Sequence, residues 1–312
     1  MPAGLRLLAP VSRLQASTAS GQHADPAELQ RERRELSSAL DQPVCPAAGL
    51  MATDTCQSLL ETGRLWLGWI ALERDDLYQA AHDLAPLPDS AWAHYTAARQ
   101  AFHDRQYTQA AAQYGQAVDK WTRAQQDASA TLPARLGPRP DLPQVLADWG
   151  GAQFVSGDAT AAIHTLDTAV KSASNPARAL FLRARAEELA GRMEAALADY
   201  SLASRTALAH AEDLASGEAH LYRGIFLYRR KDFAHAENEF ASALNFDIPA
   251  GLRPDAIAWR HMAAVAQGAC GASRMPLEES LGAVSPYFPK DEARATASTC
   301  PLTTSALTNS AI

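Results

Sequence analysis

The sequence predicts an all-α protein built as an α-solenoid, a stack of helix hairpins. About one residue in five is alanine, which favours helix, whereas the strand-favouring residues Val and Ile are sparse. A short pattern also recurs: a polar turn precedes an alanine, a large apolar residue and a second alanine, at offsets of 4 and 3 on one helix face. One hairpin cannot bury such a stripe, so neighbouring hairpins are expected to stack.

The pattern occurs in about five copies. Three copies have an aromatic residue in the middle: Ala110-Tyr114-Ala117, Ala196-Tyr200-Ala203 and Ala236-Phe240-Ala243. Two looser copies are Ala80 with Leu84, and Ala162-Leu166-Ala169. Twelve residues before each leading alanine stands a small residue that would let the two helices of a hairpin approach closely: Gly68, Ala98, Gly150, Ala184 and Gly224. Ala162 and Ala196 are 196 − 162 = 34 residues apart, the most informative interval.

The five copies of this pattern, which we call the repeat frames, resemble the tetratricopeptide repeat family together with Leu67-Gly68, Gly224 and Tyr228. The resemblance covers roughly residues 57–249. The resemblance implies a superhelix in which the first helix of each hairpin lines a concave surface that binds extended peptides or partner helices. One subgroup of the family clamps the C-terminal carboxylate of chaperones with Lys, Arg and Asn residues. The corresponding faces here carry Leu65, Trp69, Tyr95 and Arg99 without the Asn pair, which disfavours a chaperone co-factor.

The repeats define the expected organisation of the chain. An N-terminal segment, 1–56, contains one helix over 25–40, and repeats follow at 57–126 and 144–253. Between them lies a Pro-rich insertion, 127–143, which we expect to be an extended loop because its four prolines cannot continue a helix. A capping helix is expected over 254–270, and the C-terminal segment, 271–312, is expected to be irregular.

Charge and hydropathy exclude two classes of function. Lys and Arg number 28 against 35 Asp and Glu, a net charge of −7, so the chain lacks the basic surface of a general nucleic-acid binder. No apolar run is long enough to predict a membrane span. Arg6 and Arg13 interrupt the apolar start of the chain, which makes it a poor secretion signal.

The four cysteines are Cys45, Cys56, Cys270 and Cys300, all outside the repeat frames. Separations of 11 and 30 residues match no short metal-ligand pattern. We expect two local disulfides, Cys45 to Cys56 and Cys270 to Cys300, in an oxidising compartment, periplasmic or extracellular. Closing the longer loop would contribute roughly 3 to 4 kcal/mol. The alternative is four free thiols in a cytoplasmic protein.

The motifs of several enzyme classes are missing from the sequence. There is no Gly-rich phosphate loop, no His-Glu-x-x-His zinc motif and no Gly-x-Ser-x-Gly elbow. We therefore expect no enzyme, no cofactor and no metal site. An enzyme carried by the C-terminal segment would have only Cys300 as a nucleophile, and a Cys270–Cys300 disulfide would count against it.

Function is expected on the inward-facing positions of the first helices. Aromatic residues and arginine are favoured there, because both are enriched at binding hot spots, although each could instead be core between hairpins. The preferred hot spot consists of Trp92, Tyr95, Arg99 and Phe102. Further candidate partner-binding residues are Arg178, Phe181, Arg185 and Tyr228. Tyr228 belongs to the inward-facing positions expected around Gly224, which are Glu218, Leu221, Ile225 and Tyr228. The middle repeat offers only Gln144, Ala147, Gly151 and Phe154.

The sequence thus favours a non-enzymatic adaptor that binds a protein or peptide in its groove, within a bacterial envelope or secretion assembly. The alternative is a polysaccharide- or peptidoglycan-binding module of an exopolysaccharide export system, in which Trp92 and Tyr95 would stack on sugars. Glycan binding should survive high salt and tolerate Arg99→Ala, whereas binding of an acidic peptide should weaken in both cases.

Overall fold

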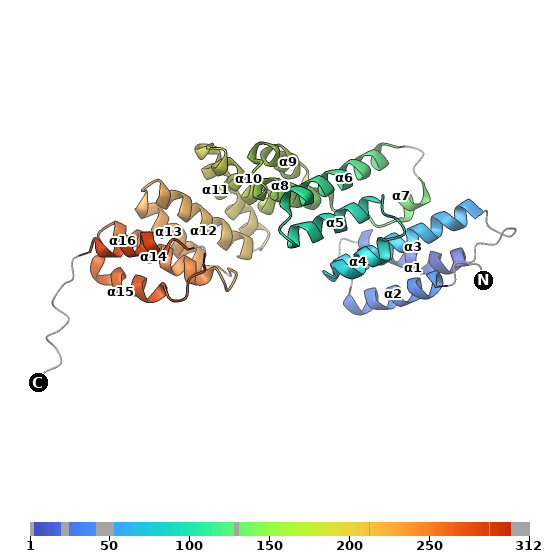
Figure 1. Cartoon of the computed structure of the whole chain (residues 1–312), viewed down its shortest axis with the longest axis horizontal. Coiled ribbons are helices and arrows are strands. Elements are labelled where there is room, and N and C mark those ends of the chain that lie inside the picture. Colours follow the sequence, from blue (N-terminus) through green and yellow to red (C-terminus); the bar gives the residue numbers. More distant parts are fainter. Residues whose placement is uncertain are drawn as a thin grey trace, which may run out of the picture. The chain divides into compact units, whose positions relative to one another are not determined.

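A computed structural model describes residues 3–19, 25–41, 53–127, 131–211, 213–246, 248–286 and 288–300. Over these ranges the chain consists of helices joined by turns and short connections, without a strand, and successive helices form antiparallel pairs (Figure 1). The predicted all-α solenoid of stacked hairpins is confirmed. The chain forms two compact units, Met1–Thr165 and Leu166–Ile312, and the boundary falls within α9 (Ala159–Ser172).

In the described residues, the N-terminal unit contains two complete hairpins, the helices that flank them, and α8 (Leu142–Val155) with the start of α9. The hairpins are α3 (Thr53–Glu73) with α4 (Leu77–Leu84) and α5 (Ala91–His103) with α6 (Tyr107–Gln126). On one side, α1 (Ala3–Ala19) and α2 (Pro26–Leu40) pack against α3, and Leu7, Leu14 and Leu36 are buried. On the other, α8 packs against α6. The short α7 (Leu132–Leu136) packs on α3 and also contacts α1.

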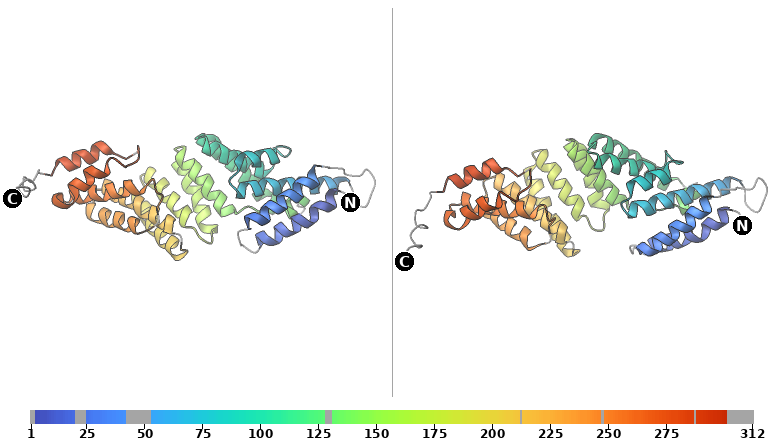
Figure 2. Two further views of the ribbon diagram at one scale, coloured as in Figure 1. Left: turned by 90° about the horizontal axis from the view of Figure 1, so that it is seen from below. Right: turned by 60° about the horizontal axis from the view of Figure 1, so that its bottom comes forward.

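The C-terminal unit contains three hairpins and a final short helix. The hairpins are α10 (Ala177–Leu189) with α11 (Met193–Ala209), α12 (Asp213–Arg229) with α13 (Phe233–Asn245), and α14 (Arg253–Ala266) with α15 (Cys270–Ser280). The last helix, α16 (Lys290–Ser298), packs against both α14 and α15, and both views of Figure 2 show these three orange to red helices side by side.

Each hairpin turn has the same backbone conformation. Five residues before each leading alanine stands a residue with positive φ: Asp75, Arg105, Gly157, Gly191 and Lys231. The next backbone N–H closes the helix end, as when Asp232 donates to the Leu227 carbonyl at 3.0 Å. Gly268 repeats this turn with φ +92°, and Ala269 donates to the Ala264 carbonyl at 3.0 Å. The predicted capping helix is therefore the first half of a further hairpin, α14 with α15.

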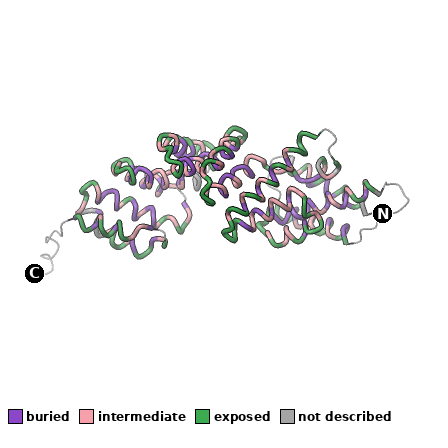
Figure 3. Tube along the Cα trace, turned by 45° about the horizontal axis from the view of Figure 1, so that its top comes forward, coloured by how far each residue is buried: buried purple, intermediate pink, exposed green. Residues whose placement is uncertain are grey.

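The small residues and the alanines act as predicted inside the hairpins. A Cβ on Gly224 would lie 2.6 Å from a ring carbon of Phe240, and one on Gly68 would lie 2.5 Å from Leu84. The leading alanines of all five frames are 0% exposed. Figure 3 shows buried positions on the helix sides that face neighbouring helices and exposed positions at the turns. Close helix approach thus buries the repeated stripe.

Three segments outside the repeats are more ordered than expected. The N-terminal segment holds α1 in addition to the predicted helix α2, because the apolar face of α1 is buried against α2 and α3. The C-terminal segment is not irregular throughout: it contains α16, whose Ala293 and Ala297 are buried. The Pro-rich insertion is anchored by two indole N–H groups, since Trp66 donates to the Leu136 carbonyl at 2.8 Å and Trp92 to the Pro138 carbonyl at 3.2 Å.

The disulfide between Cys270 and Cys300 is present, with an S–S distance of 2.03 Å, as predicted. It joins the start of α15 to the residue that lies just beyond α16. No cysteine in the described part of the chain is a free thiol, and this includes Cys56. Cys45 lies outside the described residues, so its pairing with Cys56 stays a prediction.

Candidate partner-binding surface

The preferred hot spot lies on α5 in the N-terminal unit, and its first member is part of the core. Trp92 is 7% exposed, and its ring packs edge-on against Trp121 with centroids 5.0 Å apart. Its indole N–H donates a hydrogen bond to the Pro138 carbonyl of the Pro-rich insertion. Trp92 therefore has little surface to offer a partner, and it positions Tyr95, whose ring centroid lies 5.9 Å away.

The other three residues of this hot spot are more accessible. Tyr95 is half-buried, and its hydroxyl lies 3.5 Å from a carboxylate oxygen of Asp148 on α8. The half-buried Arg99 pairs with Asp75 in the preceding hairpin turn, with its guanidinium carbon 5.9 Å from the Tyr95 ring centroid. Phe102 is 39% exposed. This side of α5 therefore presents an aromatic and charged surface, but its arginine is already paired.

In the C-terminal unit the structure joins two predicted residues with one that the sequence reasoning missed. The guanidinium carbon of Arg185, on α10, lies 4.3 Å from the ring centroid of Tyr222, on α12. The Phe181 ring lies 5.4 Å from the same Tyr222 ring. A planar guanidinium on a tyrosine face combines a cation–π contact with edge N–H groups that point past the ring. These three half-buried side chains form the centre of a surface shared by two first helices.

Charged groups border this centre. Glu188 accepts hydrogen bonds from the Tyr200 hydroxyl at 3.0 Å and from Arg229 at 2.9 Å. Glu218 is half-buried, and burial raises its pKa while the positive charges of Arg178 and Arg185 oppose that rise. We call Phe181, Arg185 and Glu188 of α10 with Glu218, Tyr222 and Arg229 of α12 the α10–α12 surface. It can take up a ligand that has both apolar and hydrogen-bonding groups.

Arg178 and Tyr228 lie at the edges of this arrangement in different ways. Arg178 is exposed in the first turn of α10. Tyr228 is only 6% exposed, and its ring packs against Phe233 and Trp259 at centroid distances of 5.1 and 5.2 Å. Leu221 of the same set is also buried. On α12 the accessible stripe is therefore Glu218, Tyr222, Ile225 and Arg229.

The missed residue had a signal in the sequence. Tyr222 follows Glu218 by four residues and precedes Arg229 by seven, so all three fall on one helix face. The sequence reasoning chose Leu221 and Tyr228 instead, one position earlier in each case. The accessible stripe of α12 therefore shares Glu218 and Ile225 with the predicted set, and has Tyr222 and Arg229 in place of the buried Leu221 and Tyr228.

Other kinds of site leave no trace in the described residues. No group of three or more His, Cys, Asp or Glu side chains there could hold a metal ion. Within the same ranges, none of the helices combines the length and the apolar character that crossing a membrane would require.

Comparison with known proteins finds the fold but no sequence relative. No protein-family model and no curated protein sequence matches the chain. Among solved structures, the apo form of RapI is similar with a TM-score of 0.55 at 9% identity, covering 93% of this chain and 79% of that one. A Rap protein complexed with competence and sporulation factor has a TM-score of 0.54 at 13% identity, covering 94% of this chain and 77% of that chain.

A third similar structure is a tetratricopeptide repeat protein from Parabacteroides merdae ATCC 43184. Its TM-score is 0.50 at 12% identity, and the match covers 94% of this chain and 99% of that one. At these identities the similarity concerns the fold, and it extends over nearly the whole chain.

Proposed function

Because the chain has the fold of a tetratricopeptide repeat protein, we propose that it is a non-enzymatic adaptor that binds a protein or peptide partner on its first helices. The observation that carries the proposal is the α10–α12 surface, where Arg185 stacks on Tyr222 beside Phe181. Aromatic and arginine side chains that are held in place bury area and form hydrogen bonds at little entropic cost, as at protein-binding hot spots.

The surface suits an extended polypeptide. Its apolar rings lie between carboxylates and guanidinium groups, so a segment could place an apolar side chain against Phe181 and bond its backbone or charged groups to Arg185 and Glu218. The similar Rap structure in complex with competence and sporulation factor supports a binding role for this fold. The N-terminal residues Tyr95, Arg99 and Phe102 would offer a second contact region.

The setting that fits the disulfide is an oxidising one. Cys270–Cys300 would persist in a periplasmic or extracellular protein, where thiol-reducing systems do not remove it. A bacterial envelope or secretion assembly is such a setting, and we include it in the proposal.

The test is a site-specific comparison in the full chain. A photo-crosslinking residue replaces Tyr222, and crosslinked proteins from native extract are identified by mass spectrometry. The partner that is found is then titrated against purified wild type, Arg185→Ala and Arg205→Ala. Arg205 is an exposed arginine on α11 outside the surface, so its variant is a control for the lost charge.

We expect Arg185→Ala to weaken binding by about 10-fold or more, because Arg185 is held on the Tyr222 ring within the surface, and Arg205→Ala to leave it unchanged. Equal affinities for both variants would contradict the proposal. Recovery of a glycan with salt-independent affinity would instead support the polysaccharide-binding alternative.

A further inference from the structure

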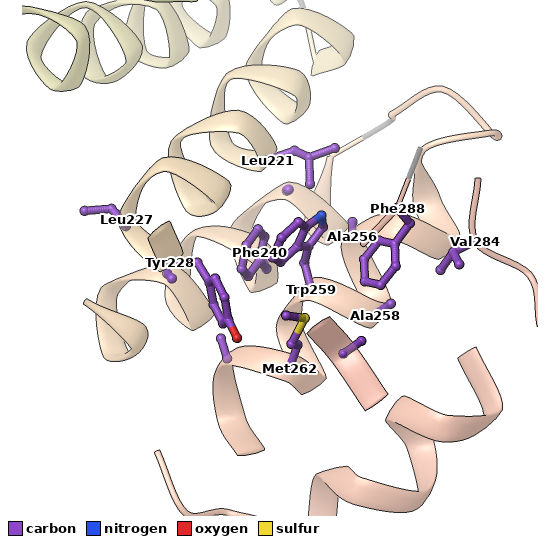
Figure 4. Packing of buried hydrophobic residues seen from close by; sticks show 14 of the residues in the cluster. Leu221, Leu227, Tyr228, Phe240, Ala256, Ala258, Trp259, Met262, Val284 and Phe288 are labelled. Carbon is purple, nitrogen blue, oxygen red and sulfur yellow. The ribbon is translucent and has the colours of Figure 1, made fainter. Parts of the chain in front are cut away.

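The inner face of the last hairpin is covered by the chain itself. Residues 281–286 and 288–300, which we call the strap, run from the end of α15 through α16 and pack on α14. Val284, Phe288, Ala293 and Ala297 of the strap belong to the same buried cluster as Trp259 of α14. Figure 4 shows Phe288 beside Trp259 and Val284 beyond Phe288, with Tyr228 on the other side of Trp259.

The covered face is equivalent to the α10–α12 surface. The turn residues Lys231 and Gly268 are 268 − 231 = 37 residues apart, which sets the register between α12 and α14. With that shift, Glu218 corresponds to Asp255 and Tyr222 to Trp259. An acidic residue and an aromatic residue thus occupy the same two positions on both first helices, accessible on α12 and covered on α14.

The strap contacts these positions as a ligand would. Asp255 accepts two hydrogen bonds of 2.7 Å, from the backbone N–H and from the hydroxyl of Ser285. Three residues later, the Phe288 ring packs edge-on against Trp259 with centroids 5.2 Å apart. Farther along, the Thr296 hydroxyl lies 3.5 Å from that of Tyr228. The Asp255 carboxylate thus holds the strap backbone at Ser285, and the Trp259 indole packs against the Phe288 ring.

The larger buried apolar residues of the strap, Leu281, Val284 and Phe288, precede α16, and the buried residues of α16 itself are the two alanines. A helix of nine residues is marginal without tertiary support. The Cys270–Cys300 disulfide closes the loop that contains the strap, at a sequence separation of 30 residues. It therefore limits how far the strap can leave α14.

We propose that Asp255, Trp259 and Tyr228 form a second binding surface, for an extended segment that has a hydroxyl residue followed three positions later by an aromatic residue. The chain's own strap occupies this surface while the Cys270–Cys300 disulfide is intact. The proposal is independent of ligand binding at the α10–α12 surface.

Reduction by a dithiol opens the loop. A thiolate of the reductant attacks the sulfur of Cys270, the more exposed of the two cysteines, and the S–S bond breaks. Cys300 leaves as a thiolate and takes up a proton. The second thiol of the reductant then displaces Cys270, which also becomes a thiol, and the reductant is left as a disulfide.

The test uses the full chain and a labelled synthetic peptide with the sequence of residues 281–299. Because a tethered strap would compete with the peptide, the resident strap is weakened by Ser285→Ala and Phe288→Ala. This strap variant is compared with the disulfide intact and with Cys270→Ser and Cys300→Ser added. Peptide binding is followed by fluorescence anisotropy, and hydrogen exchange is measured helix by helix.

We expect the peptide to bind when the disulfide is absent and at least about 10-fold more weakly when it is present. Adding Asp255→Asn should weaken peptide binding by about 10-fold, because the substitution removes the charged group that accepts the hydrogen bond from the backbone N–H of residue 285. In the otherwise wild-type chain, reduction should speed exchange in α16 on the order of 100-fold and leave α10–α13 unchanged.

Three results would overturn the proposal. One is exchange in α16 that does not respond to reduction. Another is a peptide that fails to bind the disulfide-free strap variant while α10–α13 remain protected. The third is loss of protection throughout α10–α13 on reduction, which would make the strap a required part of the core and not a removable occupant.

Discussion

At the residue scale, Glu187 is a buried carboxyl group inside the first hairpin of the C-terminal unit. The neighbouring Arg183 donates to Asp199 through two nitrogens, at 2.6 and 2.9 Å, and to Asp167 at 3.0 Å. Glu187 is 7% exposed, and within the described part of the chain its Oε2 atom has no hydrogen-bond partner. Burial raises the pKa of Glu187 to about 7, the Asp199 charge adds to the rise, and Arg183 opposes it.

This raised pKa predicts how stability depends on pH. The native state holds the Glu187 proton more tightly than the unfolded chain, whose glutamate pKa is near 4.5. The free energy of unfolding that Glu187 contributes is therefore fully present below that value and is lost as pH rises to about 7. Urea denaturation from pH 4 to 8 measures it.

Glu187→Gln is the control, since it keeps the shape and cannot titrate. The difference in unfolding free energy between wild type and this variant should fall with rising pH up to about 7 and then level off. A difference that is constant with pH would show that the native state does not raise the pKa of Glu187.

At the element scale, the same turn conformation, with one residue at positive φ, recurs in the hairpins. Its positive-φ position is glycine in some hairpins, but Asp75, Arg105 and Lys231 hold it with φ of 56, 61 and 64°. An L-residue in this region costs roughly 1 to 2 kcal/mol relative to a right-handed conformation, whereas glycine adopts it readily.

Lys231→Gly should therefore stabilise the α12–α13 hairpin. After the greater chain entropy of glycine in the unfolded state is subtracted, we expect a gain of about 0.5 to 1 kcal/mol in the free energy of unfolding, measured by urea denaturation. Lys231→Ala loses the same side chain but keeps the strained φ, so it should be nearly neutral. Equal effects of the two substitutions would mean that the backbone conformation is not responsible.

At the scale of the whole molecule, a stack of hairpins should respond to damage locally. Within each unit, a hairpin packs on its neighbours in the chain, so a defect weakens nearby repeats most. Gly68 and Gly224 provide a matched pair, because a side chain at either position would clash with the second helix of its own hairpin, at Leu84 and Phe240 respectively.

Gly224→Val should lower hydrogen-exchange protection in the C-terminal unit by about 10-fold or more and leave α3 to α6 unchanged, because overpacking strains the hairpin that contains it. Gly68→Val should give the reverse pattern, so each variant is the control for the other. Parallel loss of protection in both units would show instead that the chain unfolds as a single cooperative body.

The repeat architecture could be predicted from the sequence because its determinants are local. A turn residue, a small residue and an alanine stripe recur at fixed offsets, and each acts within one hairpin, as Gly224 and Phe240 show. The Cys270–Cys300 pairing could also be proposed, because both cysteines lie outside the repeats at one end of the chain.

The candidate site was less predictable. On α12 two members of the predicted set, Glu218 and Ile225, lie on the accessible stripe. Tyr228 does not, because it packs on Trp259 of α14 and lies against Thr296 of the strap, whereas Tyr222 stays accessible. Helical periodicity identifies residues that share a face, but the direction of that face depends on how adjacent hairpins pack. Trp92 shows the same limit, since its partner Pro138 comes from an insertion 46 residues away.

The sequence by itself determined the class of fold, the hairpins and the residue types on their first helices, because these follow from short-range spacing. Only the tertiary structure decided which of those side chains meet and which are covered. Arg185 contacts Tyr222, which is 222 − 185 = 37 residues later in the chain. Ser285 donates to Asp255, which is 285 − 255 = 30 residues earlier. Such contacts arise from the packing of whole helices, which no local pattern specifies.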